Sequence, residues 1–275
     1  MYDAVSPSDA PALQRAVGEL RVELRARDGR TVLDGLRQAG CLKARFPRPE
    51  DAAWLNIVTL NTSGGIAGGD ALDSTFVVGA GAQTTIAAQA AERFYRALPQ
   101  SAASSVRTRI AVAAGGAAEW LPQETILFDR CAVRRHLRVE LAADAWFLGV
   151  ESVLFGRAAM GEVVEQASLR DLIEVRRGGR LLLHDAIRLD GAVAATLRRP
   201  AIADGARAVA TLVYVASDAE TMLDPLREAE VAVSAWDGML IARMLAGDGA
   251  SLRAAVINAL QVLRRGRALP RVWLC

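Results

Sequence analysis

Acidic side chains beside apolar or glycine-containing segments are the residues of this sequence best suited to chemistry. They are Asp70, Glu119, Glu124, Asp129, Glu151 and Glu162. A carboxylate in such surroundings is costly unless a partner compensates its charge. Glu124 and Glu151 are each followed six residues later by an arginine, Arg130 and Arg157, which favours a ladder of structural ion pairs. Two carboxylates can also serve as acid and base in glycoside hydrolysis, but no spacing here brings a pair to the required separation.

Residues 61–70 read NTSGGIAGGD, a loop whose glycines are Gly64, Gly65, Gly68 and Gly69. A phosphate-binding loop needs a following Gly-Lys-Ser/Thr and a helix, and a dinucleotide-binding turn needs a strand before it and a helix after it. Neither condition is met, because a strand-like alternation follows Asp70. Ser63 also lacks the G-x-S-x-G frame of a hydrolase nucleophile. We therefore expect a structural loop rather than a phosphate-binding enzyme.

Nitrogen and sulfur ligands for a metal are scarce. The chain has two histidines and three widely spaced cysteines, with no C-x-x-C pair. Tight sites for late divalent transition metals favour imidazole and thiolate ligands. We expect no dedicated high-affinity metal site and no stably bound cofactor, while a weak path of oxygen ligands stays open.

The composition excludes several classes of partner. The 275 residues are 52% hydrophobic, and 33 basic residues nearly balance 31 acidic ones, for a net charge of +2. Aromatic residues are only 5%, so neither a basic groove nor base-stacking platforms are indicated. No apolar run approaches the roughly 18 residues of a membrane span, and the N-terminal residues do not resemble an export signal. We expect a cytoplasmic protein without nucleic-acid or membrane partners.

The elements that must position these residues are mostly short strands. Alternation of apolar and polar residues begins near Leu20, and further strand patterns cover residues 55–60, 70–78, 81–88 and most of 106–155. Short strands with glycine or acidic turns favour layered β structure over alternating strands and helices. We expect residues 1–19 to be a lead-in open to disorder and residues 20–275 to form a single domain.

Helical patterns are fewer. Residues 87–98 fit a helix, although their surroundings are strand-like, and Asp218 is placed to cap a short helix that contains Pro225. Asp237-Gly238 predicts a β-hairpin. Ser251 opens an apolar stripe of helical period that ends before Gly266, which predicts a C-terminal helix.

A weak internal echo indicates stacked strands. The pattern Leu-x-x-Glu-x-x-x-Phe-x-Arg occurs at residues 121–130 and again at 148–157, and its Phe-x-Arg ending also occurs at 94–96. Such periods are typical of stacked β units whose equivalent residues form ladders.

Six motifs follow one another along nearly the whole chain. They are NTSGGIAGGD (61–70), TTIAAQAAERFYR (84–96), EWLPQETILFDR (119–130), SVLFGRAAMGE (152–162), RRGGRLLLHD (176–185) and LPRVW (269–273). In this order and combination they resemble the urease accessory protein family UreD, also called UreH. No single motif would be specific, but the set is.

The resemblance implies a scaffold rather than an enzyme. Proteins of this family bind the urease apoprotein and UreF, UreF recruits the GTPase UreG, and the assembly delivers nickel to the urease active site. The implied fold is mainly β, with helically wound, layered sheets and a few helices, one of them C-terminal. The alternative is a carbohydrate-active β-helix enzyme with paired carboxylates, although such enzymes usually act outside the cell.

The positions that match the motifs of the UreD family give a candidate route for nickel in transit. Its residues are Asp70, Glu124, Asp129, Glu151 and Glu162, because hydrated Ni²⁺ can pass between carboxylates without being trapped. In a β architecture the four glycines of the loop would permit positive φ and a close approach between strands. Asp70 would then accept hydrogen bonds or face an internal passage.

Overall fold

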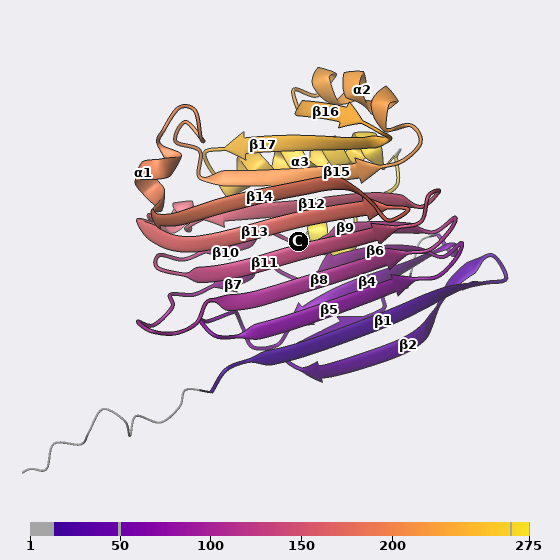
Figure 1. Ribbon diagram of the computed structural model, residues 1–275, viewed down its shortest axis with the longest axis horizontal. Helices are drawn as coiled ribbons and strands as arrows, with labels where there is room; N and C mark the ends of the chain where they lie inside the picture. The colour runs from indigo at the N-terminus through magenta and orange to yellow at the C-terminus, as the bar shows by residue number, and fades with distance from the viewer. Residues whose placement is uncertain (1–13, 49–50, 265, 275) are drawn as a thin grey trace, which may run out of the picture.

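Two β-sheets packed face to face make up most of the chain (Figure 1). The computed structural model describes residues 14–48, 51–264 and 266–274. The seven-stranded sheet has the order β14 (Arg180–Ala192), β13 (Gln166–Arg177), β11 (Ala132–Leu141), β8 (Ser104–Val112), β5 (Ala71–Val78), β1 (Val17–Arg27) and β2 (Arg30–Gly40).

The second sheet has ten strands. Its main order is β16 (Ala232–Trp236), β17 (Met239–Ala246), β15 (Ala208–Val215), β12 (Trp146–Phe155), β9 (Ala117–Leu121), β6 (Gln83–Ala88), β4 (Trp54–Asn61) and β3 (Leu42–Arg45). Two short strands, β10 (Thr125–Leu127) and β7 (Glu92–Phe94), extend from β12 beside this path.

The chain winds helically between the two sheets. From β4 to β13 it passes repeatedly from one sheet to the other, so that neighbours within each sheet come from successive windings. The central strands β5, β8, β11 and β13 are therefore parallel, as are β4, β6, β9 and β12. Antiparallel strands, such as β2, β14 and β3, lie at the edges. The predicted layered, helically wound β fold is confirmed.

Alternating side chains explain why these segments form strands around a shared core. Leu20, Val22 and Leu24 of β1 are buried, whereas the residues between them are more exposed. Leu72, Phe76 and Val78 of β5 are likewise buried. These residues join inward-facing side chains of the ten-stranded sheet in one hydrophobic core, as the period of two for strands requires.

The C-terminal helix α3 (Gly249–Leu263) covers the other face of the ten-stranded sheet (Figure 1). Leu252, Val256 and Leu260 are buried there in a second hydrophobic core. The helix begins before Ser251, because Asp248 is its N-cap and accepts a hydrogen bond from the Ser251 backbone N at 2.9 Å. The predicted helix is thus confirmed and its predicted start is corrected.

Shorter helical turns connect other elements. They are α1 (Val193–Leu197), α2 (Leu223–Glu228) and the 3-10 turns η2 (Ala158–Met160), η3 (Ala219–Met222) and η4 (Arg271–Trp273). The short helix expected after Asp218 is present as η3 followed by α2, and Pro225 lies in the first turn of α2, where its missing N–H has no intrahelical partner to lose.

The helix considered for residues 87–98 is wrong. β6 continues to Ala88, and β7 covers Glu92–Phe94. Parallel neighbours supply backbone hydrogen bonds to both segments, and Ile86 and Phe94 are buried between the sheets. Tertiary pairing therefore outweighs the helix propensity of the alanine-rich sequence.

The internal echo marks neighbouring parallel strands, but its residues do not form a ladder. Leu127 of β10 pairs with both Phe94 of β7 and Phe155 of β12, so Phe128 is displaced by one residue. A displacement of one residue turns a side chain to the opposite face. Phe128 accordingly lies against the Tyr95 ring, with centroids 5.1 Å apart.

The N-terminal lead-in is described only in part. β1 begins at Val17, earlier than the alternation around Leu20 indicated. Residues 1–13 lie outside the described residues, and the prediction for them stays a prediction.

Candidate functional site

A cavity of about 360 Å³ lies between the two sheets. The ten-stranded sheet contributes Asn61, Glu92, Trp120 and Glu151 to its lining, and β11 of the seven-stranded sheet contributes Arg135. Among the described residues that line it, the carboxylates are Glu92 and Glu151. The cavity is therefore a partly open space with oxygen ligands on one wall.

Glu151 belongs to a buried ionic cluster with Arg135 and Asp171. Arg135 Nη1 lies 2.6 Å from Glu151 Oε2, and Arg135 Nη2 lies 2.5 Å from Asp171 Oδ2. Trp120 Nε1 donates a hydrogen bond of 2.7 Å to the other oxygen of Glu151. Glu151 thus pairs with Arg135 of the facing sheet, and the expected pairing with Arg157 is wrong.

Charge and burial act together in this cluster. Its three charged side chains are exposed by 9% or less. Burial raises the pKa of Glu151, and Asp171 adds to that rise, although Arg135 acts in the opposite direction. Burial tends to lower the pKa of Arg135, but the two carboxylates outweigh it and raise that pKa. Two carboxylates share one guanidinium, so the ionised cluster carries net negative charge beside the cavity.

Glu92 is the second carboxylate of the cavity. Asn61 Nδ2 lies 3.2 Å from each of its oxygens. Burial raises the pKa of Glu92 more than this hydrogen bond lowers it. Glu92 was not among the candidate route residues, although it lies in the TTIAAQAAERFYR motif, because that stretch also fitted a helix and gave its side chain no defined direction.

Asp70 ties the glycine loop to the start of β1. It is only 5% exposed, and its carboxylate accepts hydrogen bonds from the backbone N of Ala16 at 2.8 Å and of Ala67 at 2.7 Å. In the loop, Gly65 has a φ of +143°, and a Cβ there would lie 2.3 Å from the Tyr95 ring. Gly64 and Gly65 line the cavity, whereas Asp70 is not part of its described lining.

The remaining candidate carboxylates are engaged away from the cavity lining. Glu124 pairs with Arg253 of α3 at 2.8 Å, so its expected pairing with Arg130 is wrong. Asp129 accepts a hydrogen bond from the Gln166 backbone N at 2.9 Å. Glu162 pairs with Arg157 at 2.9 Å on the surface. Each of the three carboxylates holds two parts of the chain together, which is a structural role.

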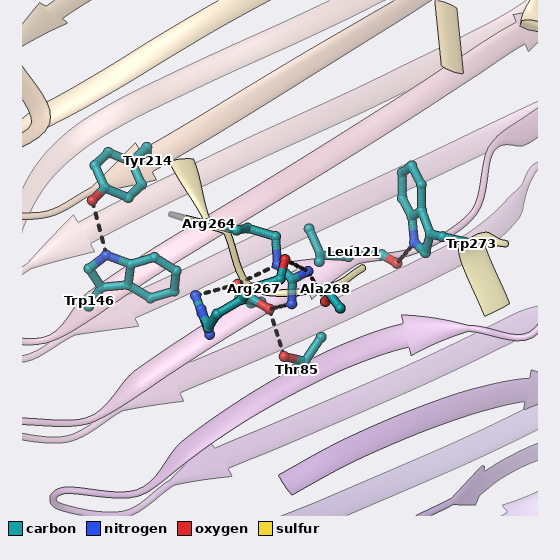
Figure 2. A network of polar contacts seen from close by, with 9 residues as sticks. Thr85, Leu121, Trp146, Tyr214, Arg264, Arg267, Ala268 and Trp273 are labelled. Atoms are coloured by element: carbon teal, nitrogen blue, oxygen red, sulfur yellow. Dashed lines mark hydrogen bonds and ion pairs between the residues drawn. The ribbon is translucent and has the colours of Figure 1, made fainter. Parts of the chain in front are cut away.

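A second buried cluster lies on the opposite face of the ten-stranded sheet, under the C-terminal segment. Glu119 is fully buried and accepts hydrogen bonds from Arg264 at 2.9 and 3.0 Å, from Arg267 at 2.7 Å and from Thr85 at 2.6 Å. Figure 2 shows Arg264 and Arg267 converging beside Thr85. The Arg267 guanidinium also stacks 3.9 Å from the centroid of the Trp54 ring.

Trp273 fastens the end of the same segment. Its Nε1 donates a hydrogen bond of 3.0 Å to the carbonyl oxygen of Leu121, as Figure 2 shows. The motif LPRVW therefore holds the C-terminal segment on the sheet next to β9. Together with Glu119, this contact fixes the segment that follows α3.

The sequence of the chain matches a known protein family. The family model described as UreD urease accessory protein matches residues 16–274. The chain belongs to the UreD urease accessory protein family.

Individual relatives match this chain over nearly their full lengths. The urease accessory protein UreD of Dinoroseobacter shibae is 45% identical over 270 residues, covering 96% of this chain and 94% of the relative. The UreD of Sinorhizobium medicae is 46% identical over 273 residues, covering 96% and 98%. The resemblance found in the six motifs is thus confirmed, and a role in urease maturation follows from membership of the UreD family.

Two features are absent from the described part of this UreD chain. Within residues 14–48, 51–264 and 266–274, no group of three or more histidine, cysteine, aspartate or glutamate side chains is arranged to hold a metal ion. In the same described part of the chain, no helix is long and apolar enough to cross a membrane.

Proposed function

We propose that this UreD chain is a non-catalytic scaffold of urease maturation. In this proposal it binds the urease apoprotein and UreF, reaches the GTPase UreG through UreF, and assists GTPase-dependent nickel delivery in the cytoplasm. Membership of a urease accessory family supports an accessory rather than a hydrolytic role. Nickel is cargo in this scheme and does not remain on the chain.

The cavity between the sheets is the observation on which the nickel part of the proposal rests. It presents the carboxylates of Glu92 and Glu151, and the Glu151 cluster, when both of its carboxylates are ionised, carries net negative charge that attracts a cation. Oxygen ligands hold late transition metals less tightly than imidazole and thiolate do. Ni²⁺ can therefore enter and leave such a site instead of being trapped.

The route that we propose differs from the five carboxylates selected by sequence. Glu151 is retained and Glu92 is added, because both line the cavity. Asp70, Glu124, Asp129 and Glu162 are assigned to holding the fold, because each is engaged in the hydrogen bonds or ion pairs described above.

The test replaces Glu92 by glutamine and measures urease activation per assembled complex with UreF and urease. The amide keeps the size of the side chain and removes its charge. We expect normal assembly and activation that is slower by roughly tenfold, equivalent to about 1.4 kcal/mol of barrier. Glu140→Gln is the matched control, because Glu140 is exposed and pairs with Arg138 outside the cavity.

Unchanged activation in normally assembled Glu92→Gln complexes would contradict the nickel route and leave the chain as a holder of its partners. Failure of wild-type chain to assemble with UreF or urease would contradict the scaffold itself. The Glu140→Gln variant separates slower activation in Glu92→Gln from a general effect of lost charge.

A further inference from the structure

Three arginines lie side by side on the outer face of the seven-stranded sheet. The register pairs Arg134 of β11 with Arg170 of β13, and Arg170 with Arg188 of β14. All three side chains are exposed, and within the described residues none forms an ion pair with a carboxylate. Like charges directly opposite one another destabilise a sheet. We call Arg134, Arg170 and Arg188 the arginine row; it is an arrangement that a bound anion would stabilise.

A shallow hollow of about 380 Å³ lies beside the arginine row. Its floor is the next set of paired residues, His136, Leu172 and Ala186. The Nε2 atom of His136 is buried and has no hydrogen-bond partner among the described residues. An imidazole nitrogen in this state can still donate to or accept from an incoming polar group. The hollow thus combines unpaired cations with an unused polar atom.

Two arginines near the arginine row on the same face are already paired with carboxylates. Arg107 pairs with Asp73 at 2.6 Å, and Arg176 pairs with Glu174 at 2.8 Å. The arginine row is therefore a group of three adjacent unpaired arginines, although the net charge of the chain is only +2; Arg109 of β8 is a further exposed arginine of this face without an ion pair among the described residues.

We propose that the arginine row and its hollow bind an acidic segment of a protein partner. Guanidinium groups match carboxylates in planar, two-pronged hydrogen bonds. Adjacent strands are about 4.8 Å apart, so the three arginines span about 10 Å, a distance that carboxylates on one face of a short segment can follow. The inference goes beyond the proposed function, because it depends on neither nickel nor urease.

The surroundings favour a protein over a nucleic acid or an anionic membrane. The flanking acids Asp73 and Glu174 are paired with Arg107 and Arg176, so these two arginines do not extend the arginine row into the longer run of free cations that a continuous array of phosphates would follow. The floor residues His136, Leu172 and Ala186 include no Phe, Tyr or Trp on which bases could stack. An isolated group of carboxylates fits between these flanking acids.

The experiment compares two triple variants of the full chain. The site variant carries Arg134→Gln, Arg170→Gln and Arg188→Gln. The control variant carries Arg21→Gln, Arg25→Gln and Arg37→Gln, which remove the same charge from arginines that are already ion-paired on β1 and β2 of the same sheet. Binding of a fluorescent hexaglutamate peptide is measured by anisotropy at low and at physiological salt.

We expect the wild-type chain to bind the peptide, the site variant to bind it at least about tenfold more weakly, and the control variant to bind it nearly as the wild type does. The site variant should be no less thermally stable than the wild type, because the repulsion within the arginine row is removed. This second readout shows that weaker binding does not come from unfolding.

Three outcomes would overturn the proposal. The wild-type chain could fail to bind the peptide, or both variants could lose binding equally, which would indicate a general charge effect. Alternatively, hexathymidylate or vesicles containing anionic lipid could bind more tightly than the peptide with the same dependence on the arginine row, which would assign the surface to phosphate-bearing partners.

Discussion

The two buried ionic clusters lie on opposite faces of the ten-stranded sheet and have opposite balances of charge. Glu119 is one carboxylate between two arginines, Arg264 and Arg267, and Thr85 donates a further hydrogen bond. The cluster of Glu151 has two carboxylates and one arginine, Arg135. The Glu119 carboxylate lines no hollow among the described residues, although its partners Arg264 and Arg267 line one beside the C-terminal segment, whereas Glu151 itself lines the cavity between the sheets.

This difference separates a structural from a functional use of buried charge. A carboxylate surrounded by donors has nothing left to offer a ligand, and its partners would be left buried without it. A cluster with excess negative charge and open space can attract a cation. The same residue type therefore anchors a segment on one face of the sheet and provides a candidate nickel site on the other.

The largest expected effect tests the structural cluster. Glu119→Gln should lower the free energy of unfolding by about 3–5 kcal/mol, because two arginines lose their buried counter-charge. The measurement is urea unfolding, with Glu162→Gln as a control. Glu162 pairs with a half-exposed Arg157, and its replacement should cost at most about 1 kcal/mol. If Glu119→Gln lowers the free energy of unfolding no more than Glu162→Gln does, the Glu119 cluster is not the structural anchor that the comparison of the two clusters assumes.

An intermediate effect is expected in the second cluster. Glu151→Gln should lower the free energy of unfolding by about 1–3 kcal/mol, because a buried hydrogen-bonding partner is changed while Arg135 keeps Asp171. The loss should be smaller than for Glu119→Gln measured side by side, since the amide also removes the excess negative charge. A loss equal to or larger than that of Glu119→Gln would show that the excess charge costs the fold nothing.

The smallest effect is a pH dependence due to Glu92. Burial raises its pKa above the ordinary value of 4.5, so the folded chain binds more protons than the unfolded chain between these two pKa values. Wild-type stability should therefore decrease as the pH rises from about 4.5 through the raised pKa, relative to Glu92→Gln. Unfolding midpoints of both proteins across this range provide the measurement. Parallel curves would mean that the Glu92 carboxylate is as well solvated in the cavity as in water.

Local patterns of the sequence predicted many elements correctly. The alternation around Leu20 forms β1, and Asp237-Gly238 forms the turn between β16 and β17 with φ values of 52° and 68°. The N-cap of α3, Asp248, lies three residues before Ser251, and its carboxylate accepts a hydrogen bond from the Ser251 backbone N, so the cap too is a local feature of the sequence. Such features depend on neighbouring residues only.

The partners of the carboxylates could not be predicted in this way. Glu124 pairs with Arg253, 129 residues later, and Glu119 pairs with Arg264, 145 residues later. Glu124 and Glu151 each lie six residues before an arginine, Arg130 or Arg157, but that spacing relates residues of one chain segment only. The actual ion pairs join different strands and helices. The register of β10, in which Leu127 rather than Phe128 pairs with Phe94, has the same origin, because register is set by pairing between strands.

The sequence by itself determined that this chain is a mainly β member of the UreD family, because alternation of side chains and motif order are properties of the chain read in one dimension. Only the tertiary structure decided which carboxylates are buried beside arginines, which face the cavity and which arginines stay unpaired. Those properties depend on distances between residues brought together by the winding of the sheets, and electrostatic energies follow these distances rather than separation along the chain.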